Sequence, residues 1–103
     1  MDITQATAGF AAMGSEPRFA VVQVLVKAGT DGLPTGAIGE RTGIPASTLA
    51  HHIKFLAAAD LITQERQGRM IVCRANFEHL KALAAYIMKE CCAEQNAESE
   101  AAA

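Results

Sequence analysis

The sequence has no tryptophan, one tyrosine and only three cysteines among its 103 residues. Three cysteines, two of them adjacent, do not form the paired disulfide framework of a small secreted protein, so we expect free thiols in a reducing compartment. No run of about 18 apolar residues is present, so we expect no membrane-spanning segment. The first residues also lack a cationic stretch before an apolar core, so no secretory signal is predicted and a cytoplasmic location is expected.

The sequence also carries little net charge, at −2, which argues against a protein that coats nucleic acid indiscriminately. This average hides an asymmetry. Residues 41–74 carry five basic and two acidic side chains, whereas residues 76–103 carry two basic and five acidic ones. The first region is therefore suited to face phosphate, and the second is not. At this length we expect one domain with a small core that dimerisation would enlarge.

The stretch IPASTLAHHIKFLAAADLI, residues 44–62, has the two-sided character of an amphipathic helix. On a helical wheel, Ile53 and Leu56 fall beside Leu49, which predicts a helix over 46–59 with one buried face. The opposite face carries hydroxyl groups, an imidazole and an ammonium, which are suited to contacting phosphates and base edges in a DNA major groove. The candidate DNA-contacting residues on this face are Ser47, Thr48, His51 and Lys54.

A shorter helix is predicted just before this one, over 35–42, with Thr35 as its N-cap and Gly43 as the left-handed residue that ends it. The two helices form a helix-turn-helix pattern. His52 lies at the edge of the apolar stripe, where a buried, hydrogen-bonded structural role is favoured over DNA contact.

Two further helices are predicted before the helix-turn-helix. The first has an apolar stripe of Ile3, Ala6, Phe10 and Met13, and it needs a partner surface to be stable. The second begins at Ser15 as N-cap, and its predicted core-facing residues are Phe19, Val22, Leu25 and Val26.

Residues 62–75 alternate like a β-hairpin whose tip contains Gly68, and Arg66 and Arg69 beside the tip are candidate DNA-backbone contacts. A solvated hairpin tip is the alternative interpretation. A last helix is predicted over 77–92, with an apolar stripe typical of a dimerisation element. Residues 93–103 are expected to be a flexible acidic tail, so that residues 1–92 form the folded domain.

This order of elements resembles the ArsR/SmtB family of winged-helix metalloregulatory repressors, from about Phe10 to Cys92. The segments that carry the resemblance are MGSEPRFAVVQVL, IGERTGIPASTLAHHIKFLAAADLI and RQGRMIV. The resemblance implies a mainly helical winged helix-turn-helix fold that dimerises through its first and last helices. It also implies a homodimeric repressor that binds an inverted-repeat DNA operator and is released by a toxic metal or metalloid.

The family's ligand sites vary, so each is compared with this sequence. The arsenic-sensing archetype has paired cysteines in the first helix of the helix-turn-helix, where this chain has none. The zinc-sensing pattern in the terminal helix, counted from His79, finds Phe77 and Ala93 at two of its four positions, so zinc is the less favoured inducer.

The remaining pair, Cys91 and Cys92, resembles cysteines near the chain's end that sense trivalent arsenicals, and thiolates prefer such soft centres. The expected inducer is trivalent arsenic or antimony, and no cofactor is required. An incidental role for these two thiols is the alternative. Cys73 is favoured as a core residue, and the alternative is a third ligand that approaches the cysteine pair of the other subunit. Two thiols suffice for a monomethylated arsenical, whereas inorganic arsenite prefers three.

Two other functions remain open at this point. The cysteines are suited to a redox or reactive-sulfur switch on the same DNA-binding fold, because exposed thiols oxidise reversibly. A winged helix that binds protein instead of DNA is the other, and the exposed basic hairpin tip argues against it. No nucleophile, base and orienting acid form a recognisable motif, so no enzymatic activity is predicted.

Overall fold

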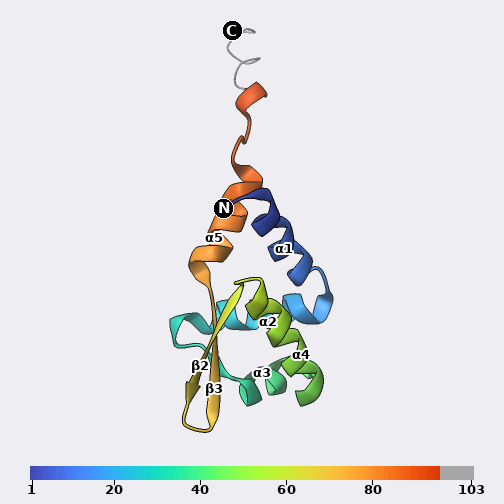
Figure 1. Ribbon diagram of the computed structural model, residues 1–103, viewed down its shortest axis with the longest axis vertical. Coiled ribbons are helices and arrows are strands. Elements are labelled where there is room, and N and C mark those ends of the chain that lie inside the picture. Colours follow the sequence, from blue (N-terminus) through green and yellow to red (C-terminus); the bar gives the residue numbers. More distant parts are fainter. Residues whose placement is uncertain (96–103) are drawn as a thin grey trace.

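The computed structural model describes residues 1–95 and consists of helices with one small sheet (Figure 1). The helices are α1 (Ile3–Met13), α2 (Glu16–Ala28), α3 (Thr35–Thr42), α4 (Ala46–Ala58) and α5 (Phe77–Met88). The strands are β1 (Leu33–Pro34), β2 (Ile62–Gln67) and β3 (Met70–Ala75), and a short 3-10 helix, η1 (Gly29–Asp31), precedes β1. The predicted fold class, mainly helical with a hairpin wing, is confirmed.

Local signals set several helix ends. The Ser15 hydroxyl accepts a hydrogen bond from the Arg18 backbone N–H at 3.3 Å, which makes Ser15 the N-cap of α2 as predicted. Gly43 has a φ of 74° and ends α3 in the left-handed conformation, also as predicted. The predicted bounds of α3 are confirmed, but the assignment of Thr35 as its N-cap was wrong, because Thr35 is the first helical residue and Pro34 precedes it without a side-chain cap.

The core lies around α2, which packs against α1, α3, α4 and β3. The prediction that Phe19 and Val26 face this core was wrong, since they are 46% and 44% exposed. The buried stripe of α2 instead runs through Val21, Val22 and Leu25. The largest fully buried side chains of the core are Leu25, Ile38, Leu56, Leu61, Ile62, Leu83, Val21 and Cys73.

The wing is the antiparallel pair of β2 and β3, and β3 also pairs with β1 on its other edge. Gln67 pairs with Met70, so only Gly68 and Arg69 form the turn, and Gly68 has the positive φ of 63° that a tight hairpin turn requires. The predicted hairpin is confirmed, although Arg66 belongs to the strand. Strand β1 was not predicted.

Helices α1 and α5 lie together at the end of the molecule opposite the wing tip (Figure 1). Their contact is close, since a Cβ added to Gly9 would touch the methyl groups of Leu83. Helix α5 ends at Met88, and the prediction that it continues to Cys92 was wrong. The predicted tail lies outside the described residues except for 93–95. Along residues 1–95, no helix combines the length and the apolarity needed to cross a bilayer.

Candidate nucleic-acid interface and cysteine pair

Helix α4 divides into a buried and an exposed face. Leu49, Ile53 and Leu56 are at most 3% exposed and fix the helix against the core. The four candidate DNA-contacting residues of this helix, Ser47, Thr48, His51 and Lys54, are all exposed. The structure therefore places them together on one accessible helix surface, which is the geometry that reading a major groove requires.

The N-terminus of α4 adds a feature that sequence reasoning missed. Pro45 is the N-cap and provides no side-chain hydrogen bond to the first turn. The first backbone bond of this helix is from the Leu49 N–H to the Pro45 carbonyl at 2.8 Å, so the preceding amides have no helical acceptor. Free amides at a helix N-terminus attract phosphate. The signal was the proline itself, which stands where a capping side chain would otherwise be.

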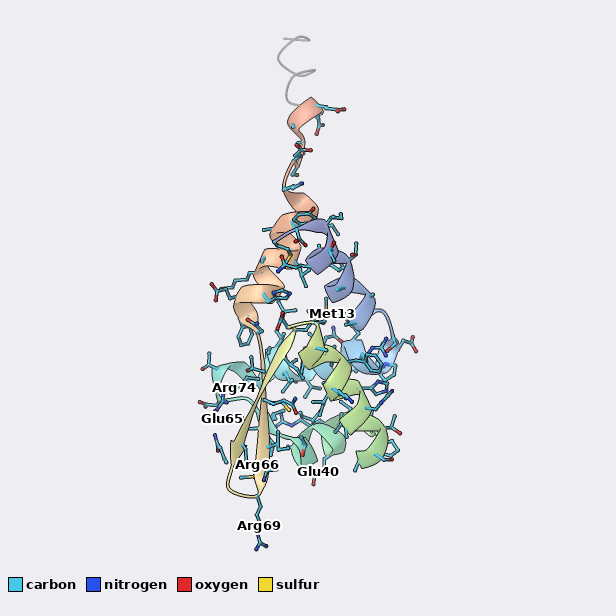
Figure 2. All side chains as sticks on the ribbon, viewed as in Figure 1. Met13, Glu40, Glu65, Arg66, Arg69 and Arg74 are labelled. Atoms are coloured by element: carbon cyan, nitrogen blue, oxygen red, sulfur yellow. The ribbon has the colours of Figure 1, made fainter. Side chains whose placement is uncertain are left out.

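The wing carries the two other candidate DNA contacts. Arg66 and Arg69 are both exposed, and neither forms an ion pair within residues 1–95. Figure 2 shows Arg69 extending from the hairpin tip, away from the rest of the molecule. An unpaired guanidinium group in this position is free to contact a phosphate or enter a minor groove.

Arg74, in contrast, is occupied within the protein. Its Nη1 lies 2.6 Å from Oε2 of Glu65 on the neighbouring strand, and its Nε donates to the carbonyl oxygen of Thr30 at 3.1 Å (Figure 2). Arg74 contributes to the positive charge of residues 41–74 in the sequence. In the structure it links both strands of the wing to η1.

His52 is half-buried, but its buried Nδ1 has no hydrogen-bond partner within the described part of the chain. The predicted burial at the edge of the apolar stripe is therefore found, whereas the predicted hydrogen bond is not.

The adjacent cysteines lie just beyond the end of α5, and both are exposed. The two Sγ atoms are 3.4 Å apart. Cys92 has a φ of 62°, which shows that the chain has left the helical conformation there. Because the two sulfurs point to a common region, one soft atom can bond to both.

Cys73 is separated from this pair. It lies on β3, is fully buried and belongs to the core cluster. Burial raises the pKa of the Cys73 thiol, so the thiolate form that binds metals is disfavoured there. These observations support the core-packing interpretation of Cys73. Within residues 1–95 no three His, Cys, Asp or Glu side chains converge in a way that could hold a metal ion.

The fold and the exposed α4 surface define a winged helix-turn-helix protein. A family model described as "Helix-turn-helix domain" matches residues 13–65, which is half of the chain, and the chain belongs to this family. A comparison with curated protein sequences found no significant match.

Solved structures show the same architecture. An ArsR-like transcriptional regulator from Rhodococcus sp. RHA1 matches with a TM-score of 0.75 and 23% identity over 95% of this chain and 89% of that one. The homodimeric winged helix-turn-helix DNA-binding domain of Mb0332 from Mycobacterium bovis, a possible ArsR-family regulator, matches with a TM-score of 0.69 and 21% identity over 85% and 82%. A possible transcriptional regulator for arsenical resistance matches with a TM-score of 0.66 and 22% identity over 79% and 81%.

The chain thus has the fold of ArsR-family transcriptional regulators. The solved structures that share this fold are named as transcriptional regulators.

Proposed function

We propose that this protein is a homodimeric transcriptional repressor that binds an inverted-repeat operator and is released when a trivalent arsenical or antimonite binds to Cys91 and Cys92. Family membership and the polar face of α4 support DNA binding. The exposed sulfurs, 3.4 Å apart, are the single observation that supports sensing by a thiophilic ligand.

The proposed dimer uses α1 and α5. Both helices lie at the end of the molecule away from the wing tip (Figure 1). They expose large apolar side chains: Ile3 is 63%, Phe10 38%, Ile87 67% and Met88 57% exposed. Burying these side chains against a second copy removes apolar surface from water, at about 25 cal/mol per Å². A two-fold dimer would present its two α4 helices about 34 Å apart, one turn of DNA, which explains why the operator should be an inverted repeat.

DNA contacts are assigned to two groups. The first group would occupy the major groove and consists of the free amides at the start of α4 and the side chains of Ser47, Thr48, His51 and Lys54. Arg66 and Arg69 would contact the backbone or the minor groove beside it. Because the wing and α4 both contact phosphate, operator affinity should fall steeply with salt concentration.

The sulfur geometry suits a pyramidal trivalent centre. With metal–sulfur bonds of about 2.3 Å, as for a zinc–thiolate bond, sulfurs 3.4 Å apart subtend an angle of about 95°. This angle is narrower than the tetrahedral angle that zinc prefers.

A monomethylated arsenous acid would exchange its two hydroxyl groups for the two sulfurs. Each new arsenic–sulfur bond would replace an arsenic–oxygen bond, and each thiol proton would leave in a water molecule.

The alternative function is a redox or reactive-sulfur switch at the same two thiols, which their exposure favours. A disulfide between Cys91 and Cys92 is disfavoured, because adjacent Cα atoms are only about 3.8 Å apart and disulfides usually need roughly 4.4–6.8 Å. An oxidative switch would therefore act through a bond between subunits or through a sulfenate or persulfide.

Operator release measured by fluorescence anisotropy separates these functions. We expect methylarsenite, arsenite or antimonite to release the DNA, and zinc and peroxide to have little effect. The C91S/C92S variant should bind DNA normally and no longer respond. The matched control is C73A, which removes a thiol from the core and should keep the response. Release by peroxide or persulfide alone would favour the redox switch, and an unchanged response of C91S/C92S would eliminate this cysteine site.

A further inference from the structure

Three side-chain contacts connect the C-terminal end of α1 to the exposed face of α4. Arg18 Nε donates a hydrogen bond to the Ala12 carbonyl oxygen at 2.5 Å. The Arg18 guanidinium carbon lies 5.4 Å from the centroid of the Phe55 ring, within the range of a cation–π interaction. Phe55 in turn packs edge to face against His51, with ring centroids 4.9 Å apart and an interplanar angle of 84°.

The position of Phe55 is not explained by core packing. Its side chain is 48% exposed, whereas the core-facing residues of the same helix are almost fully buried. It lies one turn after His51, so the two rings meet on the outer surface of α4. The Phe55 ring contacts both the Arg18 guanidinium group and the His51 imidazole.

These contacts restrict a side chain that would otherwise be mobile. An exposed imidazole on a helix samples several rotamers, and fixing it only at the moment of DNA contact costs conformational entropy. A ring packed against His51 limits these rotamers before DNA arrives, which is how binding sites gain precision. Arg18 holds the Phe55 ring, and the Ala12 carbonyl oxygen holds Arg18.

We propose that Phe55 and Arg18 are positioning residues that hold the His51 imidazole in the orientation needed to discriminate one base pair of the operator. This inference rests on the proposed DNA binding. It also places the orientation of a DNA-reading side chain under the control of α1, because the hydrogen bond from Arg18 ends on the last turn of that helix.

The test uses the full-length protein and an operator selected from randomised DNA duplexes with the wild type. Affinities are then measured for this operator and for each single base-pair substitution. We expect H51A to lose about tenfold of the preference at one base pair in each half-site. F55L and R18M should lose a severalfold part of the preference at the same base pair, and F55Y, which retains an aromatic ring, should restore it.

A double variant and a matched control distinguish positioning from general destabilisation. The double variant H51A/F55L should lose no more of the base-pair preference than H51A alone, because Phe55 acts only through His51. The control is F19L, the same substitution at an equally exposed phenylalanine on α2, and it should leave every preference unchanged. Without DNA, the NMR signals of the His51 ring protons should carry a ring-current shift from the Phe55 ring, which F55L removes and F19L keeps.

Several results would overturn the proposal. Three outcomes would each show that Phe55 is only structural. The first is a uniform loss of affinity across all operators in F55L, and the second is additive effects in the double variant. The third is His51 resonances that do not respond to F55L. If the wild type selects an operator and H51A keeps every preference, the positioning inference fails while DNA binding stands. If the wild type selects no operator at all, the proposed function fails, and this inference fails with it.

Discussion

Replacing Arg74 with alanine should loosen the base of the wing without removing a DNA contact. Its guanidinium group bonds to Glu65 on β2 and to the Thr30 carbonyl oxygen in η1, so it cannot reach a phosphate without giving up these partners. The sequence alone would group Arg74 with the other basic residues between 41 and 74. The structure separates it from Arg66 and Arg69, and this difference can be measured.

The expected loss of stability is modest. The side chains of Arg74 and Glu65 are 29% and 55% exposed, so solvent screens their ion pair, which then contributes about 0.2–1 kcal/mol. The hydrogen bond to the Thr30 carbonyl adds about 1 kcal/mol, and water can satisfy this exposed carbonyl when the arginine is removed. We therefore expect Arg74→Ala to lower the free energy of unfolding by roughly 1–2 kcal/mol.

Salt dependence provides the decisive measurement. Each lost phosphate contact lowers the slope of log affinity against log salt concentration by about 0.9, so Arg69→Ala should lower it by about 1.8 in a dimer with two wings. Arg74→Ala should leave the slope unchanged while lowering stability in urea. Glu65→Gln serves as the control, since it weakens the ion pair and keeps the bond to Thr30. An equal loss of slope in Arg74→Ala and Arg69→Ala would refute the assignment of Arg74 to the wing's internal support.

Three further predictions concern the dimer and the core. Ile87→Glu should give a monomer in sedimentation experiments, because it places a carboxylate in the proposed α1–α5 interface, where Ile87 is 67% exposed in a single chain. Gly32→Ala should lower stability in urea by about 2 kcal/mol or more, since Gly32 has a φ of 70° and a Cβ there would collide with the Cys73 carbonyl. Stability should also fall as pH rises above 9.0, where the unfolded Cys73 thiol ionises but the folded one, with its raised pKa, stays protonated. Denaturation of Cys73→Ala across this pH range should show a smaller fall.

Elements whose structure depends on a few neighbouring residues could be predicted from the sequence. The helical wheel predicted α4 over 46–59, one residue longer than the observed helix. The prediction succeeded because the spacing of the apolar residues in this segment is compatible with only one buried face. Gly43 and Ser15 were assigned correctly because a left-handed helix end and an N-cap each depend on a few adjacent residues. The hairpin followed from alternation and from Gly68.

Features that depend on packing between distant segments could not be predicted. An apolar stripe continues past Met88, but residues 89–95 are all exposed, so packing within the chain does not extend α5 beyond that residue. Two apolar stripes on α2 are compatible with helical spacing, and tertiary packing selects the one without Phe19. Strand β1 is only two residues long and exists because Leu33 pairs with Cys73. The contact of Arg18 with Phe55 joins residues of two helices and has no signal in the sequence.

These contacts form a route through which the proposed ligand binding at one end of the molecule would act on the proposed DNA surface at the other. A ligand shifts an equilibrium only through its different affinities for two conformations. In one chain the segment that follows α5 lies far from the wing, so a bond across Cys91 and Cys92 touches no DNA-facing residue directly (Figure 1). Helix α5 does pack closely on α1 at Gly9 and Leu83, and α1 is tied through Arg18 to the outer face of α4. Both the proposed dimer interface and the proposed DNA surface would then depend on helix α1. Ligand binding that changes the packing of α5 would act on DNA through α1.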